Sequence, residues 1–545
     1  MNRIKNNKWL YVCLFSFVGS SLWGVSCDSG WVFPLTLSPI YQTGNQPKVA
    51  IDNQKNALAI WRLYDGDSFR IQSARYNALT NLWTPFDQLV YLSESVNSQG
   101  SYEQQLSMNS AGNAIAVWCF DQGDESSIQA SSFHALTKMW DPITSVTTLS
   151  DVAENSYFPH ISLALNNNGD GFAVWQWDDL IQAARYDGNV GWQAAVDISA
   201  TDSATTPDVA TSSNGNATAV WTIWDNDDAV VQSSSYASGS WTPIASLPLL
   251  SATGGDAYWP CVAMDSSDNA LAVWYRYDSN GNAIIQSSFK PSGQPWTGAL
   301  YISDPGEDAF YPRVAMNAAG AAIVMWYRFD GQTWRIQARH RSSSGVWSQI
   351  YTISSPDYDA FAPVVIMDDQ GNGFAAWKIY DSVGNARIQV GCYDASTQQW
   401  TPPSQQPLLS PAGANADYPD IAVNQEGNVV VGWQWFDGRN WRIQVITQTA
   451  PEPPQNLRAS KYVRRDSRYP VVVICWDAPH GDIAGYNVYH IDPCTGMRFL
   501  PANIPASQGT CFCHYGRKIG CTDIYEVSSV DNVGNESEKV RVIVS

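Results

Sequence analysis

The residues best suited to bind a ligand lie in two stretches that carry arginines beside aromatic side chains. Arginine presents a planar fork of donors that matches a carboxylate with two parallel hydrogen bonds. Tyrosine and tryptophan offer ring faces on which a sugar can stack. We expect one binding site, formed by Tyr258, Trp259, Arg276, Tyr311, Arg313 and Arg328, with Tyr275 and Tyr327 beside them. The alternatives are that Arg276 and Arg328 are exposed strand residues, and that the aromatic residues only fasten their own loops.

Catalytic signatures are sparse, and we expect no catalytic residue and no bound metal. Between residues 31 and 450 the only histidines are His134, His160 and His340, without metal-ligand spacing. No Gly-x-Ser-x-Gly, phosphate-binding or dinucleotide motif is present. The arginines are faintly similar to the arginine cluster of sialidases, but the sialidase Ser-x-Asp-x-Gly-x-Thr-Trp box is absent. Paired carboxylates of a glycosidase stay open, because their pairing is spatial.

Calcium is the one cofactor that the sequence leaves open. The Asp-rich stretches 225–228 and 278–282 offer oxygen ligands. Neither stretch has the spacing of a calcium-binding helix–loop–helix, so both are interpreted first as turns.

Eight repeats must position these residues. A repeat contains Pro-x-Val-Ala, a Gly-Asn turn, Ala-Val-Trp, an aromatic-Asp pair, Ile-Gln, a second Trp and Leu-Ser. From the first tryptophan to the eighth is 372 residues (433 − 61) in seven steps, or about 53 per repeat. The first tryptophans are Trp61, Trp118, Trp175, Trp221, Trp274, Trp326, Trp377 and Trp433, and we number the repeats 1 to 8 by them.

Each repeat contains four segments of strand character, which is typical of a propeller blade. The sequence therefore predicts an all-β protein with an eight-bladed β-propeller over residues 31–450. In repeat 5, Ala270 and Ala272 alternate with Leu271 and Val273, so small and bulky side chains should face opposite neighbours. Repeat 8 lacks the second Trp and Leu-Ser, and Trp31 with Leu37-Ser38 supplies them. We expect this N-terminal strand to close the ring.

Repetition separates structural residues from functional ones. The Asp of each aromatic-Asp pair, the Gln and both tryptophans occur throughout, so we interpret them as structural, with an ion-binding ring as the alternative for the Asp. The loops that cross between blades carry Asp256–Trp259, Asp308–Tyr311, Asp359–Phe361 and Asp417-Tyr418. These loops predict an acidic and aromatic face that suits sugar rings.

A second domain follows a stiff Pro-rich linker at residues 451–455. The domain covers residues 456–545, and the motif Pro454-x-Asn456-Leu457 spans its start. It also carries Trp476, Gly485-Tyr486-Asn487-Val488-Tyr489 and Tyr525. In these motifs the chain resembles a fibronectin type III domain, with Trp476 as the core tryptophan and Tyr525 as the corner tyrosine. The resemblance implies a β-sandwich that serves as a spacer or interaction module.

Five of the ten cysteines lie in this second domain. We expect disulfides among Cys494, Cys511, Cys513 and Cys521, with Cys511 and Cys513 each pairing with Cys494 or Cys521. A zinc site that includes His514 is the alternative. Cys475 is expected to be a buried thiol, and Cys119, Cys261 and Cys392 are expected to be unpaired because they lie in separate blades.

The N-terminal segment is typical of a secretory signal. Arg3, Lys5 and Lys8 precede an apolar run over residues 9–18, which is too short to span a membrane. Residues 1–26 are therefore predicted to be a signal peptide. Gly24-Val25-Ser26-Cys27 resembles a bacterial lipobox, which would place a lipid on Cys27; ordinary cleavage is the alternative. We expect export to the cell envelope or beyond, with no spanning helix in the mature chain.

The composition reduces the number of function classes that fit the chain. A net charge of −20, from 31 basic and 51 acidic residues in 545, excludes a nucleic-acid partner. The chain resembles bacterial eight-repeat propeller proteins. The favoured hypothesis is an exported, non-catalytic binding or adhesion scaffold whose ligand is a glycan or an envelope protein. The alternatives are a glycan-active enzyme (glycosidase or lyase) on the acidic and aromatic face, and a structural assembly subunit.

Overall fold

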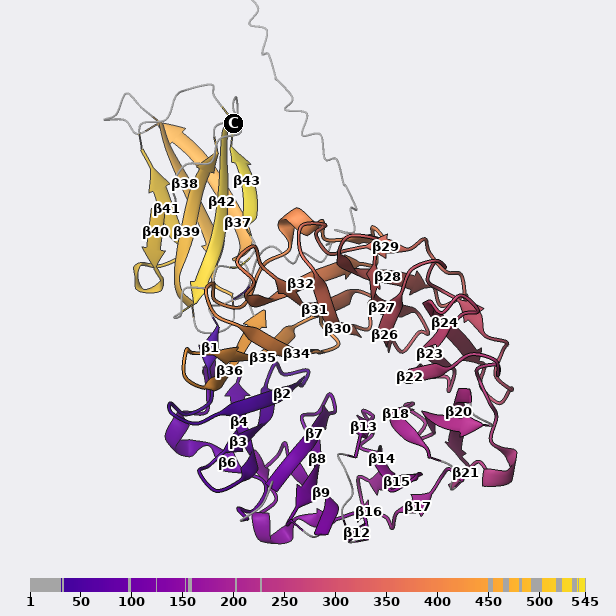
Figure 1. Ribbon diagram of the computed structural model, residues 1–545. Coiled ribbons are helices and arrows are strands. Elements are labelled where there is room, and N and C mark those ends of the chain that lie inside the picture. Colours follow the sequence, from indigo (N-terminus) through magenta and orange to yellow (C-terminus); the bar gives the residue numbers. More distant parts are fainter. Residues whose placement is uncertain are drawn as a thin grey trace, which may run out of the picture.

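The protein is all-β, as its computed structural model shows (Figure 1). Within the part of the chain described here there is no α-helix, and no helix long and apolar enough to cross a membrane. The short 3-10 turns are Phe86–Gln88, Ile143–Ser145, Ile244–Ser246, Pro403–Gln405 and Ala506–Gln508. The structure describes residues 31, 34–96, 100–123, 125–151, 153–154, 159–200, 203–225, 228–448, 454–463, 470–479, 483–491, 502–515, 522–531, 537 and 539–544. The predicted signal peptide and Cys27 lie outside these residues.

Each repeat contributes three long antiparallel strands with short strands at their outer edge, and these sets of strands surround a common centre (Figure 1). Repeats 3 to 8 form separate sheets, whereas repeats 1 and 2 are joined into one sheet by a parallel pairing of Phe69 with Gly100. This arrangement is consistent with a β-propeller. The first strands, nearest the centre, are β2 (Gly44–Ile51), β7 (Gly100–Met108), β13 (Ile161–Leu165), β18 (Thr205–Thr211), β22 (Ala257–Met264), β26 (Ala309–Met316), β30 (Ala360–Met367) and β34 (Ala416–Val423). The second strands are β3 (Ala57–Tyr64), β8 (Ala114–Asp121), β14 (Gly171–Trp177), β19 (Ala217–Asp225), β23 (Ala270–Tyr277), β27 (Ala322–Phe329), β31 (Gly373–Tyr380) and β35 (Val429–Phe436).

The outer part of each sheet is built from one more long strand and from two-residue strands. The third strands are β4 (Phe69–Asn77), β9 (Glu125–His134), β15 (Leu180–Asp187), β20 (Asp228–Ala237), β24 (Ala283–Lys290), β28 (Trp334–Arg341), β32 (Ala386–Asp394) and β36 (Trp441–Gln448). The two-residue strands are β1 (Leu35–Thr36), β5 (Leu82–Trp83), β6 (Val90–Tyr91), β10 (Met139–Trp140), β11 (Thr147–Thr148), β12 (Ala153–Glu154), β16 (Gly191–Trp192), β17 (Val196–Asp197), β21 (Ser240–Trp241), β25 (Leu300–Tyr301), β29 (Tyr351–Thr352) and β33 (Gln399–Trp400).

The core lies between adjacent sheets, and the alternation in the second strands determines which neighbour each side chain meets. Ala270, Ala272 and Trp274 pack with residues of repeat 4. Leu271 and Val273 pack with residues of repeat 6. The predicted small-and-bulky alternation is confirmed, and the first tryptophans of all eight repeats are fully buried in these layers.

The Leu/Ile-Ser step of each repeat has a structural explanation. Its serine Oγ accepts the backbone amide hydrogen of the Ile or Val that precedes the repeated Gln, at 2.8–3.0 Å, in every repeat. In repeat 8 this serine is Ser38, from the other end of the chain. Strand β1 pairs with β36, and Leu37 packs with Ile443 and Val445. The predicted N-terminal strand therefore does complete the last sheet.

The C-terminal strands form two sheets around one core that contains Trp476, Tyr486 and Tyr525. The first sheet has the order β37 (Gln455–Val463), β38 (Pro470–Asp477), β41 (Cys511–His514), and the second has the order β40 (Ala502–Pro505), β39 (Ile483–Ile491), β42 (Asp523–Asp531), β43 (Val540–Val544). Trp476 is fully buried, as expected of a core tryptophan, and Tyr525 is fully buried beside it.

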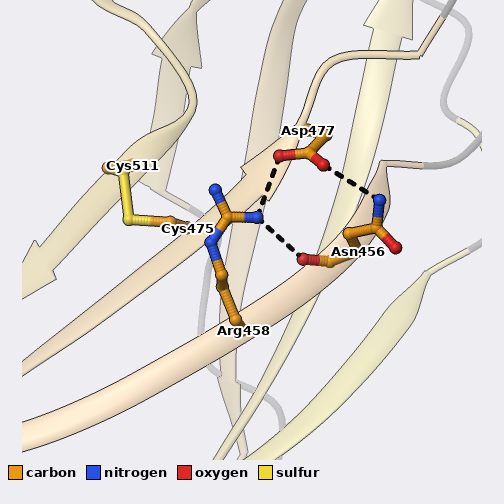
Figure 2. Close-up of a disulfide and its surroundings, with 5 residues drawn as sticks. All are labelled: Asn456, Arg458, Cys475, Asp477 and Cys511. Atoms are coloured by element: carbon orange, nitrogen blue, oxygen red, sulfur yellow. Dashed lines mark hydrogen bonds and ion pairs between the residues drawn. A yellow bond between two sulfur atoms is a disulfide. The ribbon is translucent and has the colours of Figure 1, made fainter.

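The cysteine pairing differs from the prediction. Cys475 forms a disulfide with Cys511, directly opposite it on the paired strand β41, and is therefore not a buried thiol (Figure 2). Trp476 faces the core, so its neighbour Cys475 points away from it, within reach of Cys511. This bond removes Cys511 from the predicted pairings and from the zinc alternative. Beside it, Arg458 Nη1 donates to Asp477 Oδ1 at 2.9 Å, which joins β37 to β38.

The remaining cysteines divide into free and bonded residues. Cys513 is a free, exposed thiol, so its predicted pairing is also wrong. Cys119 and Cys261 are free and buried, as expected. Cys392 is disulfide-bonded, so the prediction that it is unpaired is wrong. The other two disulfide candidates, Cys494 and Cys521, lie outside the described residues.

Candidate functional site

A cavity of about 840 Å³ lies at the centre of the ring and takes lining residues from the first strands of all eight repeats. Its shape follows from the x-Pro-y step of these repeats, which in repeat 2 has glutamine in place of proline (Glu103-Gln104-Gln105). At residue x the strand bulges and φ is near +50°, as at Gln46, Glu103, Thr206, Trp259, Tyr311, Ala362 and Tyr418. A left-handed backbone at a non-glycine residue costs about 1–3 kcal/mol. Because the bulge recurs around the ring, it belongs to the fold, and it brings residues x and y to the cavity wall.

One side of the cavity is aromatic. Four lining side chains form a chain of ring contacts that we call the aromatic arc: Trp259, Tyr311, Tyr327 and Phe361. Successive ring centroids are 5.1, 5.7 and 5.3 Å apart. Tyr311 is 37% exposed, so the arc presents ring surface to a ligand as well as to its own neighbours.

A second aromatic layer supports the arc. Tyr275 packs edge-on against Phe310, and Trp334 packs edge-on against Tyr327. Burial raises the pKa of Tyr275 and of Tyr327 well above the ordinary phenol value. Their hydroxyl groups therefore stay protonated at neutral pH and can donate hydrogen bonds.

Residue y supplies many of the polar groups of the cavity. Arg313 donates from Nη1 to the Cys261 Sγ at 3.1 Å. Burial raises the pKa of the Cys261 thiol to about 11, so the sulfur stays protonated. His160 packs edge-on against Trp259 with centroids 5.1 Å apart, and burial lowers its pKa, which leaves the imidazole neutral. Lys48, Asp208 and Asp420 occupy the same position in other repeats and also line the cavity.

The two aspartates are held between repeats. The Asp208 Oδ1 accepts from the Ser162 hydroxyl at 2.7 Å, and its Oδ2 accepts from the Val262 amide at 2.8 Å. The Asp420 Oδ2 accepts from the Val49 amide at 2.8 Å, which links repeat 8 to repeat 1. Burial raises the pKa of both carboxyl groups. They are therefore structural acceptors whose charged form is disfavoured.

The structure brings together only part of the predicted site. Trp259, Tyr311 and Arg313 line the cavity. Tyr258 lies behind the arc against Tyr275, and burial raises its pKa to about 12.

Arg276 and Arg328 do not line the cavity. Arg276 donates to the carbonyl oxygens of Ala252 and Thr253, and Arg328 donates to that of Pro305. Both arginines come near the end of a second strand, where the loop from the preceding repeat offers carbonyl groups. They are partly exposed strand residues, as the alternative expected, and they also fasten loops.

Several cavity residues carried no signal of their own in the sequence, among them Glu103, Asp208 and Asp420. One signal was present in the repeat. Residue y differs from repeat to repeat while its surroundings are kept, as in Lys48, Gln105, His160, Asp208, Cys261, Arg313, Val364 and Asp420. Variation at one fixed position of a regular repeat marks a position at which the fold does not require the same side chain in every repeat.

The repeated aromatic-Asp pairs are structural where the structure describes their bonds. The Asp65 Oδ1 accepts from the amides two and three residues on, and the same turn occurs at Asp330 and Asp437. At Asp278 and Asp381 the Oδ1 accepts from the amides two and four residues on. Among the described residues, no group of three or more His, Cys, Asp or Glu side chains has the geometry to hold a metal ion.

The repeated Gln is also structural, and it acts within its own sheet: Trp274 Nε1 donates to Gln286 Oε1 at 3.0 Å. The second tryptophans bond between sheets, as Trp296 Nε1 does to the Ser233 Oγ at 2.9 Å.

No family model and no curated protein matches this sequence. Solved structures with a similar fold include a protein of unknown function from Dyadobacter fermentans (10% identity, 76% of this chain and 98% of that one, TM-score 0.39). They also include the β-propeller domain of the trilobed protease of Pyrococcus furiosus (8%, 68% and 99%, 0.41) and a polysaccharide lyase, ulvan lyase (10%, 68% and 95%, 0.42). With TM-scores under 0.5 these similarities assign no activity, so the function is argued from the cavity.

Proposed function

We infer that the protein is a carbohydrate-binding scaffold and that the ligand binds in the central cavity. The observation that carries this proposal is the aromatic arc, whose four rings line a single cavity. The C–H groups of a sugar stack on aromatic faces, while its hydroxyl groups need donors and acceptors at the edge of the ring. Gln105, His160 and Arg313 supply such groups in the same cavity.

The test is an oligosaccharide array probed with residues 28–545, followed by calorimetric titration of each glycan that binds. Trp259→Ala should weaken binding by at least about tenfold, because it removes a stacking anchor. The matched control is Tyr301→Ala in the outer strand β25, where the ring is 59% exposed; this variant should bind as the wild type does. The proposal fails if no glycan binds, or if folded Trp259→Ala keeps full affinity.

A glycan-active enzyme, glycosidase or lyase, is the second candidate. It is favoured by Asp208 and Asp420, because a carboxyl group with a raised pKa beside a ligand can act as a general acid. The backbone amides that both groups bind favour the structural role instead. Long incubation of a bound glycan with the wild type and with Asp208→Asn decides between them: an enzyme releases new chain ends, and the variant does not.

The wider organisation is part of the proposal. An eight-bladed propeller closed by its N-terminal strand would present the cavity, and a fibronectin type III domain would act as a spacer. The disulfides at Cys475–Cys511 and at Cys392 fit an exported protein, since such bonds persist in oxidising compartments. A lipid on Cys27 would anchor the chain to the cell envelope. Calcium in the Asp-rich turns is tested by repeating the array with a chelator. An envelope-protein ligand and an assembly role are the alternatives if no glycan binds.

A further inference from the structure

Arg313 reaches the central cavity with most of its hydrogen-bonding capacity unused. Its one hydrogen bond to the described residues goes to the Cys261 Sγ, and a thiol sulfur is a weak acceptor. A guanidinium carries five N–H donors. Within the described part of the chain, Arg313 has no carboxylate, carbonyl or hydroxyl partner. The remaining donors are therefore open to a ligand.

Several other arginines of the repeats are used differently. The arginine that precedes Ile-Gln lies near the Asp of its own repeat and binds the carbonyl oxygen of the Leu/Ile-Ser serine, as Arg335 does with Asp330 and Ser354. Arg276 and Arg328 bind loop carbonyl groups. Arg313 is distinct because its position in the repeat, residue y, faces the cavity.

The acidic groups of the cavity form hydrogen bonds with residues other than Arg313 or lie on other strands. Asp208 is bound by Ser162 and Val262, and Asp420 by Val49, with Lys48 Nζ 3.8 Å from its Oδ1. Glu103 lines the wall formed by repeat 2. None of these carboxylates forms an ion pair with Arg313. The guanidinium thus keeps its charge without a fixed counter-ion in contact.

Arg313 also lies next to the aromatic arc, two residues after Tyr311 in β26. We propose that the glycan bound in this cavity is acidic. Arg313 binds the carboxylate or sulfate group of the glycan, while the sugar ring stacks on Tyr311 and Trp259. This inference rests on the proposed carbohydrate site and adds the class of sugar. A planar fork fits two oxygens of one anionic group, which a neutral hydroxyl cannot match.

The first test leaves the protein unchanged and varies the probe. Trigalacturonate, trimannuronate and a sulfated galactan trisaccharide are titrated against residues 28–545, each beside its carboxyl-reduced or desulfated counterpart. An acidic probe should bind at least about tenfold more tightly than its neutral counterpart, the ratio expected from a charged hydrogen bond. Preference for the uronates or for the sulfated sugar identifies the anionic group.

The second test varies the arginine. Arg313→Met should remove the preference for the acidic probe, and Arg313→Lys should restore only part of it, because lysine keeps the charge and loses the fork. The control Arg276→Met should keep the wild-type preference. Equal binding of acidic and neutral sugars by the wild type overturns this inference and leaves the carbohydrate site standing. Failure of every glycan to bind overturns both, as does binding unaffected by Trp259→Ala.

Discussion

The side-chain oxygen of Ser38 accepts a 2.9 Å hydrogen bond from the backbone amide of Ile443, which lies 405 residues further along the chain. The same serine oxygen accepts from Arg442 Nε at 3.1 Å. Seven other repeats make the serine–amide contact within a short stretch of chain. In repeat 8 it joins the two ends of the ring, so the closure uses the same bond as every other sheet.

Ser38→Ala should lower the free energy of unfolding by about 1–3 kcal/mol, because it leaves the buried Ile443 amide without an acceptor. Urea unfolding followed by circular dichroism measures this change. The matched control is Ser303→Ala, which removes the equivalent 2.9 Å bond to Ile285 inside the chain and should cost a similar amount. If Ser38→Ala keeps the wild-type free energy of unfolding while Ser303→Ala lowers it, the ring is open.

Asp208 should make the protein less stable as the pH rises from the ordinary carboxyl pKa towards the raised pKa of the folded chain. Burial raises the pKa of this carboxyl group in the folded chain, while the unfolded chain keeps the ordinary value of about 4. Between these two values the folded state binds more protons, so stability falls with increasing pH. Asp208→Asn should flatten this part of the profile, measured by urea unfolding between pH 4.5 and pH 8. An unchanged slope would show that Asp208 is not the group responsible.

The Cys475–Cys511 disulfide should stabilise the C-terminal domain. It closes a loop with a sequence separation of 36 residues, and a loop of this size predicts about 2–4 kcal/mol. Cys475→Ala with Cys511→Ala should lower the unfolding temperature of this domain in calorimetry of the full chain. Cys513→Ala removes an exposed free thiol and should have no effect. If the Cys475→Ala, Cys511→Ala variant and Cys513→Ala have the same unfolding temperature, the pairing of Cys475 with Cys511 is refuted.

The repeat made the architecture predictable. The regular positions of the first tryptophan, the Ile-Gln step and the Leu/Ile-Ser step each correspond to one contact that recurs in the sheets, such as Trp274 with Gln286 and Ile285 with Ser303. A missing Leu-Ser in repeat 8 and a surplus one at Ser38 therefore predicted which strand fills the gap.

The site was less predictable, because its residues meet only through the ring. Residue type suggested that Arg276, Arg313 and Arg328 act together, but loop carbonyl groups bind two of them. The pairing of Cys475 depended on the register between β38 and β41, which the spacing of cysteines does not contain. Asp208 and Asp420 resemble many other aspartates in an acidic chain until the fold brings them to one cavity.

The bulges that the structure describes in seven of the first strands have a consequence for how this protein can change. The bulge fixes the path of the backbone, and residue y then projects from a wall whose geometry does not depend on its identity: lysine, histidine, cysteine, arginine, valine and aspartate all occupy it. Except at Asp208 and Asp420, which bond to the neighbouring repeat, one substitution at residue y can thus change the chemistry of the cavity without disturbing the layers between the sheets. Related chains that keep the tryptophans and serines while exchanging residue y would share a scaffold and differ in what they recognise.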